Sequence, residues 1–363
     1  MSENKPETIK EIVNEIFADG KAKGDGEKMG FKIQNRRYTG SKAKLVDWIM
    51  EVIELECEGE TFFDIFTGTG IVSLEALKKF KRVIINDFLY SNNIIYKGFF
   101  KKGNWDKEKL TRQLDYFNSL KGDKLNTNYF SDNFGTKYFH FDNAKKIGHI
   151  RNLIEEKKES FNEKEYSILL SSLIYSIDKI SNTVGHYDAF LRRKNLEQKQ
   201  LEIKLIEPYN FENNIEIYRN DANDLANKIK SDIVYIDPPY NSRQYSRNYH
   251  LLETLVKWDK PKLYGVTMKP EQENMSEYCR KKAPEVFKDL INNLESNYIV
   301  VSYNNTYTKS SSSRNKMTFE EIINILEGRG TTKIVNKEHK PFNAGNTDFD
   351  DHKEFLFITK VGR

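Results

Sequence analysis

A chain of 363 residues is long enough for one large domain or two ordinary ones. Hydrophobic residues make up 38% of it and aromatic residues 13%, which excludes wholesale disorder because a substantial core can form. A net charge of +4 neither requires nor excludes a nucleic-acid partner, since many enzymes carry a similar charge.

Local sequence excludes two further classes of protein. No stretch approaches the ~18–20 consecutive apolar residues that a membrane-spanning helix needs, and the N-terminus lacks the basic and apolar regions of a signal peptide. Cys57 and Cys279 are the only cysteines, so we expect neither a disulfide framework nor a cysteine-based zinc site. These features favour a protein of a reducing cytoplasm.

The first part of the chain precedes the predicted sheet. Apolar residues recur with helical spacing between Ile9 and Phe17, and a glycine- and lysine-rich stretch follows. We therefore expect a peripheral helix and a connector over residues 1–30. The loop NRRYTGSKAKL then leads into a predicted helix over residues 45–55.

Two short apolar runs then flank a helical pattern. Residues 61–66 (TFFDIF) and 82–87 (RVIIND) are typical of buried strands. Residues 71–80 between them have helical spacing, and Gly68 and Gly70 separate this helix from the first strand. A strand–loop–helix–strand unit of this kind predicts an α/β fold with a parallel sheet.

Helical and irregular sequence follows to about residue 207, and strand patterns then resume. Five further strands are predicted, at residues 215–218, 232–237, 298–303, 332–336 and 355–359. With the first two strands this makes seven. We expect the last two strands to pair antiparallel at one edge of the sheet.

The long helical stretch interrupts the predicted sheet. We predict one domain built from residues 31–95 and 208–363, with a mostly helical substrate domain inserted over 96–207. The alternative is that these helices belong to a single domain. Positive charge is concentrated in this middle stretch, which faces either phosphates or solvent.

The glycine loop after the first strand indicates a nucleoside-type ligand. Ligands of open α/β sheets bind at the carboxyl ends of the strands, where glycines let the backbone approach them. Asp87 ends the second strand, where a carboxylate can accept hydrogen bonds from ribose hydroxyls. Dinucleotide spacing is not met, because Ser73 holds the third glycine position. Asp64 within the first strand suits a ligand with an ammonium group, as in S-adenosylmethionine.

The sharpest signal is the turn Asp237-Pro238-Pro239-Tyr240, which follows an apolar strand. The prolines stiffen the turn and leave only carbonyl acceptors. A carboxylate, a carbonyl and an aromatic face at one point suit an exocyclic amino group on a planar base. If the Asp237 carboxylate and the Pro238 carbonyl each accept a hydrogen bond from adenine N6, the lone pair of that nitrogen becomes available for attack on a sulfonium methyl. An ordinary strand-ending turn is the alternative.

These motifs resemble the S-adenosylmethionine-dependent DNA adenine-N6 methyltransferases, in the alpha-type order of the D12 class. The stretch DPPYNSRQYSRNYHLLETL is similar to methyltransferases of type IIS restriction–modification systems. The resemblance implies a Rossmann-like seven-stranded methyltransferase sheet with an inserted, mostly helical target-recognition domain. It also implies S-adenosylmethionine as cofactor, double-stranded DNA as partner, a separately acting restriction endonuclease and a bacterial cytoplasm. We expect a monomer and no metal.

The resemblance also assigns roles to individual residues. The residues that match the family's catalytic turn are Asp237, Pro238, Pro239 and Tyr240. The residues that match cofactor-binding positions are Tyr38, Lys42, Asp64, Phe66, Gly68, Gly70, Asp87, Asp221 and Asp237. Asp221 matches the acid that binds the amino group of the cofactor adenine, with Asp224 as the alternative. Ala222 stands where many relatives have an aromatic residue.

A flipped adenine also needs stacking surfaces and phosphate contacts. Cations and aromatic rings alternate after the catalytic turn, and basic residues occur in the middle region, so the predicted DNA-binding residues are Arg192, Arg193, Arg243, Tyr245 and Arg247. The stretch 182–188, which contains His186, is a further candidate for groove contacts. Residues 302–305 end a strand on the side of the site and are candidates for contact with the target base.

Three other functions fit part of the pattern. A methyltransferase acting on base amines of structured RNA uses the same turn, although a long insertion favours duplex DNA. A catalytically silent DNA-binding module would not need the intact turn. A nicotinamide dehydrogenase would share only the glycine loop.

Overall fold

The structure is a computed structural model that describes residues 30–193, 195–239, 242–305, 316–338 and 353–362. The predicted N-terminal helix and Tyr240 lie outside the described residues. Residues Phe31–Arg363 form one compact unit.

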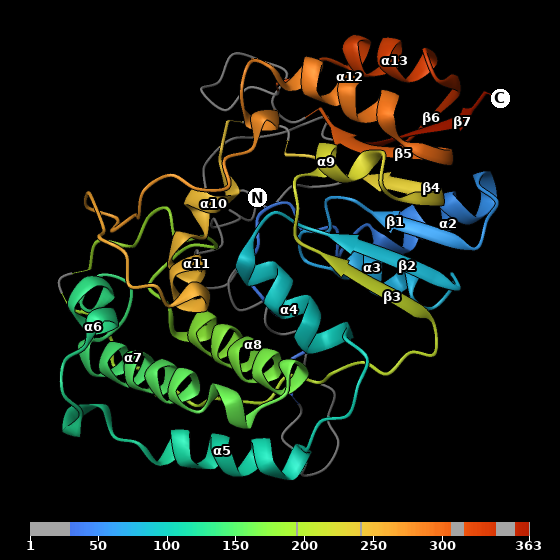
Figure 1. The fold of residues 1–363 in the computed structure, drawn as a ribbon. Helices are drawn as coiled ribbons and strands as arrows, with labels where there is room; N and C mark the ends of the chain where they lie inside the picture. Colours follow the sequence, from blue (N-terminus) through green and yellow to red (C-terminus); the bar gives the residue numbers. More distant parts are fainter. Residues whose placement is uncertain (1–29, 194, 240–241, 306–315, 339–352, 363) are drawn as a thin grey trace, which may run out of the picture. The chain divides into compact units, whose positions relative to one another are not determined.

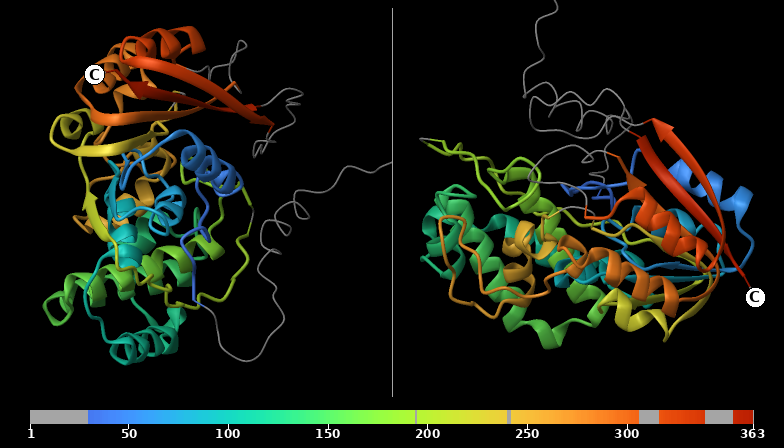
Figure 2. Two further views of the ribbon diagram at one scale, coloured as in Figure 1. Left: turned by 90° about the vertical axis from the view of Figure 1, so that its right-hand side faces the viewer. Right: turned by 90° about the horizontal axis from the view of Figure 1, so that it is seen from above.

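Seven strands form a single sheet in the described part of the chain (Figure 1). They are β1 (Thr61–Asp64), β2 (Arg82–Asn86), β3 (Asn214–Tyr218), β4 (Lys230–Ile236), β5 (Glu295–Asn304), β6 (Gly330–Glu338) and β7 (Lys353–Val361). Their order is β3-β2-β1-β4-β5-β7-β6. The neighbours from β3 to β5 are parallel, whereas β7 is antiparallel to both β5 and β6. The predicted seven strands and the antiparallel pair at one edge are confirmed, and Figure 2 shows that pair in side view.

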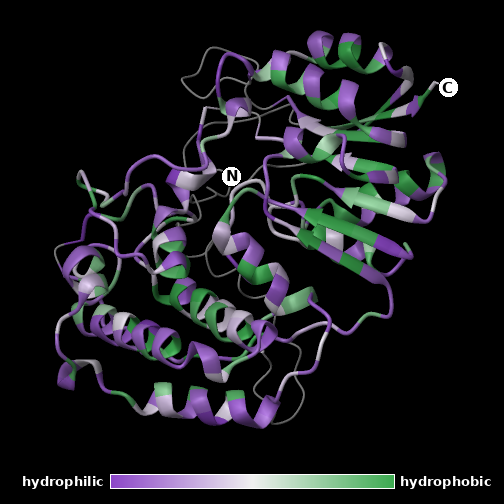
Figure 3. Ribbon diagram, in the orientation of Figure 1, coloured by the Kyte–Doolittle hydropathy of each residue, from purple (hydrophilic) through white to green (hydrophobic). Residues whose placement is uncertain are grey.

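Both faces of the sheet are covered by helices, which explains the apolar strand runs. One face packs on α2 (Val46–Glu56), α3 (Ile71–Ala76) and α4 (Tyr90–Phe100), and the other on α9 (Ala222–Ala226), α12 (Ala283–Asn293) and α13 (Phe319–Glu327). Alternate residues serve the two cores: Phe62 faces the first and Phe63 the second. Figure 3 shows the hydrophobic residues concentrated along the central strands.

The middle region is helical, as predicted. It contains α5 (Lys107–Ser119), α6 (Tyr129–Phe134), α7 (Phe141–Glu156) and α8 (Glu163–Ile180), with short 3-10 turns at Gly122–Lys124 and Lys158–Ser160. Asn128 and Asn162 begin α6 and α8 with capping boxes. No helix among the described residues is both long and apolar enough to cross a membrane.

These helices are not isolated from the sheet. α8 packs along α4, and residues of α7 and α8 share one hydrophobic core with the first face of the sheet. The predicted boundary after residue 95 falls inside α4. An inserted target-recognition domain over 96–207 therefore stays a prediction.

The centre of the sheet determines where a ligand can bind. β1 and β4 are neighbours, and the chain proceeds from β1 outward to β2 and from β4 in the opposite direction to β5. Strand order reverses at this point, so the connections diverge and leave a crevice at the carboxyl ends of both strands. Two short helices, α10 (Tyr245–Asn248) and α11 (His250–Lys257), follow β4, and a 3-10 turn at Glu277–Cys279 precedes α12.

Candidate active site

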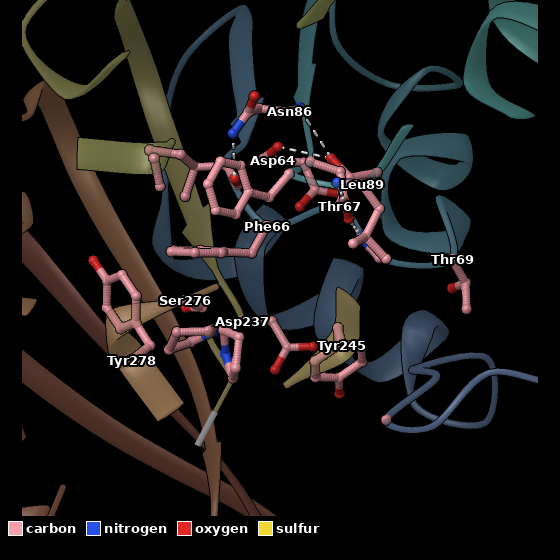
Figure 4. A pocket seen from close by; sticks show the side chains of 18 of the residues that line it. Asp64, Phe66, Thr67, Thr69, Asn86, Leu89, Asp237, Tyr245, Ser276 and Tyr278 are labelled. Atoms are coloured by element: carbon pink, nitrogen blue, oxygen red, sulfur yellow. Dashed lines mark hydrogen bonds between the residues drawn. The ribbon is translucent and has the colours of Figure 1, made fainter. Parts of the chain in front are cut away.

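An open cleft lies at this crevice, with an empty volume of about 980 Å³. Figure 4 shows side chains from several distant segments facing this hollow. The predicted residues that line it are Tyr38, Lys42, Asp64, Phe66, Gly68, Asp87, Asp221, Asp237, Pro238, Pro239 and Tyr245. The structure thus brings both predicted motifs, the glycine loop and the catalytic turn, to one cavity.

The two glycines of the loop do different things. Gly68 has φ +57° and lines the cleft, and its amide donates to Asp87 Oδ2 at 3.0 Å. Gly70 has φ +82°, a conformation that side chains rarely adopt. A Cβ on Gly70 would lie 2.7 Å from Ile33 Cδ1, and Gly70 is not among the residues that line the cleft. Gly70 therefore serves the tight turn and its packing, while Gly68 is the glycine exposed to a ligand.

Asp64 is a buried carboxylate at the floor of the cleft, only 1% exposed. Ser73 Oγ donates to its Oδ2 at 2.6 Å, whereas its buried Oδ1 has no hydrogen-bond partner among the described residues. Burial raises the pKa of Asp64 to about 7, although the bond from Ser73 acts against this shift. A buried acceptor without a donor is costly unless a ligand supplies one. Asp64 is therefore suited to bind a cationic N–H donor.

Asp87 is already engaged by the protein. Its Oδ1 accepts from the Leu89 amide at 2.9 Å, and its Oδ2 accepts from the Gly68 amide and from Asn92 Nδ2, each at 3.0 Å. The Tyr96 hydroxyl lies 3.3 Å from the same Oδ2 and donates to the Gly68 carbonyl at 2.6 Å. Burial raises the pKa of Asp87 despite these donors. In the structure Asp87 shapes the glycine loop, and ribose binding stays a prediction for it.

An aromatic corner closes another side of the cleft. The ring of Phe66 meets that of Tyr278 edge to face, with centroids 5.1 Å apart. Tyr278 donates to Asn223 Oδ1 at 2.8 Å, and Asp221, which caps α9, lines the cleft beside Ala222. Tyr278 lies in the short 3-10 turn Glu277–Cys279, and no local motif in the sequence marks it. Tyr278 supplies an aromatic ring near the position where Ala222 lacks one.

The loop before α2 is held against α10 and α11 by stacked rings. Tyr38 stacks on Tyr249 with ring centroids 4.7 Å apart and an interplanar angle of 6°. The guanidinium of Arg36 lies 4.9 Å from the centre of the Tyr38 ring, and the Thr39 amide donates to the Tyr249 hydroxyl at 2.8 Å. This packing fixes the loop that delivers Lys42 to the cleft.

Asp237 emerges directly after β4 and is part of a charged cluster. Its Oδ1 lies 2.9 Å from Lys42 Nζ, and the same ammonium lies 3.2 Å from Glu354 Oε1. Burial raises the pKa of Asp237 to about 6; Lys42 lowers it and Glu354 raises it. The sequence analysis assigned Lys42 to the cofactor and missed Glu354, which lies on β7, far from the motifs in sequence.

The predicted DNA-binding residues have different environments. Arg192, Arg193 and Arg243 are exposed, outside the cleft. Arg247 donates to the Pro270 carbonyl at 2.6 Å and so holds a loop. Tyr245 lines the cleft, and its hydroxyl donates to the Thr39 carbonyl at 3.1 Å.

Two residues proposed to contact the target base are instead part of the core. Ser302 and Tyr303, on β5, are both fully buried. Ser302 Oγ donates to Glu354 Oε1 at 2.6 Å, and the Tyr303 hydroxyl donates to the Met317 carbonyl at 3.2 Å. The prediction is wrong for these two residues, because both are buried away from the cleft where β5 pairs with β7.

A Rossmann-like sheet whose central strands carry a glycine loop and an Asp-Pro-Pro turn into one cleft is the fold and site of an α/β methyltransferase. The family model of the D12 class N6 adenine-specific DNA methyltransferases matches residues 38–315, and the chain belongs to this family. The predicted family and its adenine-N6 specificity are confirmed. Such enzymes act on double-stranded DNA and require a methyl donor.

Individual relatives agree with the family. The type II methyltransferase M.NlaIII of Neisseria lactamica is 34% identical over 340 residues, covering 88% of this chain and 98% of its own length. M.FokI of Planomicrobium okeanokoites is 36% identical over 344 residues, covering 88% of this chain and 52% of its own. The modification methylase StsI of Streptococcus sanguinis is 35% identical over 325 residues, covering 84% and 48%. The chain thus spans about half the length of the last two.

Proposed function

We propose that this protein transfers the methyl group of S-adenosylmethionine to N6 of an adenine that is turned out of duplex DNA at a specific site. The observation that carries the proposal is the convergence of Asp237 and Pro238 with the glycine loop on one cleft. A dehydrogenase would not need Asp237 and Pro238, and a DNA-binding module would need neither these residues nor the glycine loop.

The residues of the cleft fit S-adenosylmethionine. Within the part of the chain that the structure describes, the buried Oδ1 of Asp64 has no hydrogen-bond partner, and it can accept a bond from the ammonium group of the methionine end. Asp221, Phe66 and Tyr278 offer a carboxylate and two rings for the adenine end. When bound, S-adenosylmethionine supplies an electrophilic methyl group on a sulfonium sulfur.

The catalytic turn prepares the target amino group. The Asp237 carboxylate accepts one N–H of adenine N6, and the Pro238 carbonyl accepts the other. These bonds draw the nitrogen toward tetrahedral geometry, so that its lone pair is available for attack. They strengthen as positive charge develops on the nitrogen, and each such preorganised bond lowers a barrier by roughly 3–4 kcal/mol. As the new N–C bond forms, the bond from the methyl carbon to sulfur would break and leave a neutral thioether, and the methylated nitrogen would then release one proton. Asp237 must be ionised for this, so the rate falls as pH drops through about 6, the value to which burial raises its pKa.

We infer that DNA enters the cleft past two loops, which form a rim. The first loop (residues 181–193) is tied to both walls: Arg37 donates to the Thr183 carbonyl at 3.0 Å, and the Tyr187 amide donates to the Asn248 carbonyl at 2.7 Å. Arg37 precedes Tyr38, and Asn248 ends α10. This loop is therefore positioned by the same segments that build the site.

The second loop (residues 258–276) is anchored beside the first. The Tyr138 hydroxyl lies 2.8 Å from the Tyr187 carbonyl and 2.9 Å from the Thr267 carbonyl, so it contacts both loops. The tips carry exposed aliphatic side chains, Val184 and Val266, and Val266 is 71% exposed. Exposed aliphatic groups beside cations suit DNA, because they insert between bases while cations bind phosphates. We assign Arg192 and Arg193 of the first loop to this DNA-facing rim, together with Arg243, whose charge acts on His186 of the same loop.

The decisive assay is methyl transfer itself. The purified protein is incubated with labelled S-adenosylmethionine and either duplex DNA or total RNA, and the methylated nucleoside is identified after digestion. We expect N6-methyladenine in DNA. Label found only in RNA would overturn the assignment in favour of an RNA base-amine methyltransferase.

The variant Asp237→Ala separates catalysis from binding. We expect methyl transfer to fall by at least a hundredfold, because the carboxylate that accepts a hydrogen bond from N6 is lost. Affinity for DNA should change little. The matched control is Asp115→Ala, which removes an exposed carboxylate on α5 and should leave transfer unchanged. A silent DNA-binding module would show no transfer in the wild type.

We further propose that this enzyme acts as a monomer in a bacterial cytoplasm and protects DNA from a separate restriction endonuclease. The names of its relatives as type II and modification methylases support the protective role. Expression in a host without adenine methylation, followed by genome-wide mapping of modified adenines, would give the recognition sequence. Resistance of that DNA to an endonuclease with the same sequence would support the protective role, and light scattering would test the monomer.

A further inference from the structure

A buried glutamate lies beneath the catalytic turn, beyond the part of the chain that the family model matches. Glu354 is near the start of β7 and is 2% exposed. Ser302 Oγ donates to its Oε1 at 2.6 Å, and Lys42 Nζ lies 3.2 Å from the same oxygen. Lys42 Nζ also lies 2.9 Å from Asp237 Oδ1. A single ammonium group is therefore shared by two carboxylates.

The sheet does not need a charge at this position. The residues that follow on β7, from Phe355 to Ile358, are apolar, and Leu356 and Phe357 are fully buried. A buried carboxylate is costly unless it is paired and hydrogen-bonded. Both partners of Glu354 are present, and one of them is the lysine that contacts Asp237. The cluster therefore serves the turn rather than the packing of the strand.

The charge balance of the cluster explains what the glutamate adds. Lys42 and Asp237 alone would neutralise each other. With Glu354 ionised, the three groups together carry one net negative charge, next to the nitrogen that becomes positive during methyl transfer. Glu354 also holds the ammonium that contacts Asp237, which keeps the catalytic carboxylate in place without cancelling its charge.

We propose that Glu354 is a positioning residue for methyl transfer, which acts through Lys42 to orient Asp237 and to keep the cluster negatively charged. This inference rests on the proposed role of Asp237 in transfer to N6. It extends the catalytic cluster from the N-terminal loop and β4 to the antiparallel edge of the sheet.

The pH dependence of the rate has a defined sign. The groups that face Asp237 are Lys42 from the N-terminal loop, Glu354 from β7, Asp64 from β1 and Tyr235 from β4. Glu354 raises the pKa of Asp237, since a second negative charge opposes its ionisation. Removal of the Glu354 charge should therefore move the acidic limb of the rate profile to lower pH.

The test is Glu354→Gln, which keeps the shape of the side chain and an acceptor for Ser302. We expect the single-turnover rate at its pH plateau to fall about ten- to a hundredfold. We also expect the acidic limb to move down by about one pH unit. Dissociation constants for DNA and S-adenosylmethionine should change less than threefold. Glu354→Asp keeps the charge. It should therefore retain more activity than Glu354→Gln, and the acidic limb of its rate profile should not move to lower pH.

The control Ser302→Ala removes the neutral partner of Glu354 and should leave the limb in place. If the wild type methylates DNA and Glu354→Gln shows the same plateau or an unmoved limb, the inference is overturned. A wild type that transfers no methyl group to DNA would instead overturn the proposed function. If Glu354→Gln loses secondary structure, the residue would be assigned to the stability of the fold. The pH profile of Glu354→Asp would then decide between a role in stability and a role in positioning Asp237.

Discussion

The carboxylate of Asp64 offers the most direct test of the cofactor assignment. Its side chain is 1% exposed, and burial raises its pKa from 3.8 to about 7. This rise in pKa means that ionising the buried Asp64 carboxyl costs about 4 kcal/mol more than ionising it in water. A bound ammonium group would compensate part of that cost. Asp64→Asn keeps the shape and an acceptor but removes the charge.

We expect Asp64→Asn to weaken S-adenosylmethionine binding by about 10- to 150-fold. A hydrogen bond to a charged group contributes about 1.5–3 kcal/mol, and the loss of one such bond gives this range. The melting temperature of the ligand-free variant at pH 8 should not fall, because the variant no longer buries an ionised carboxylate. An exposed-site control, Asp115→Asn on α5, should leave the affinity unchanged.

The affinity should also depend on pH with a defined sign. The cation binds the ionised carboxylate, and the raised pKa leaves Asp64 largely protonated below about 7. Wild-type affinity should therefore rise from pH 5.5 to 7.5, by up to about tenfold per unit below the pKa, and level off above it. Titration calorimetry measures both effects. A variant that binds as tightly as the wild type, or that keeps the same pH dependence, would refute the pairing of Asp64 with the ammonium group.

Two further predictions concern stability and DNA binding. Asp232 Oδ2 accepts hydrogen bonds from the amides of Glu60 and Thr61 and from the Thr61 hydroxyl at 2.8–3.0 Å. Asp232→Ala should therefore lower the free energy of unfolding by about 2–3 kcal/mol, as measured by urea denaturation, and leave the turnover rate unchanged. Burial raises the pKa of Asp232, but these donors outweigh it and leave the pKa lowered, so the difference from wild type should disappear as pH falls through that lowered value; a constant difference would contradict the account. The double variant Arg192→Ala/Arg193→Ala should weaken DNA binding and reduce its salt dependence by up to about two phosphate contacts in a salt titration, whereas an unchanged slope would remove both residues from the DNA-facing rim.

The sequence alone was sufficient for the strands and for the two motifs. Apolar runs such as DIVYID are periodic and local, and parallel strands that are buried on both faces leave that pattern directly in the chain. The glycine loop and the Asp-Pro-Pro turn depend on backbone geometry within a few residues. The shared edge of the parallel strands then requires Asp64 and Asp237 to lie near each other, and the structure shows both in one cleft.

The pairing of the groups in the cleft depends on contacts between segments that are distant in sequence. Glu354 joins Lys42 and Asp237 because β7 lies beside β5, a pairing that no local pattern specifies. Tyr278 reaches the cleft from a short 3-10 turn far along the chain, and Gly70 proves to lie against Ile33, where a side chain would not fit, rather than in the cleft. Local sequence determines backbone conformation and the periodicity of burial, whereas the neighbours of a buried charge depend on strand order and on loops that close over long separations.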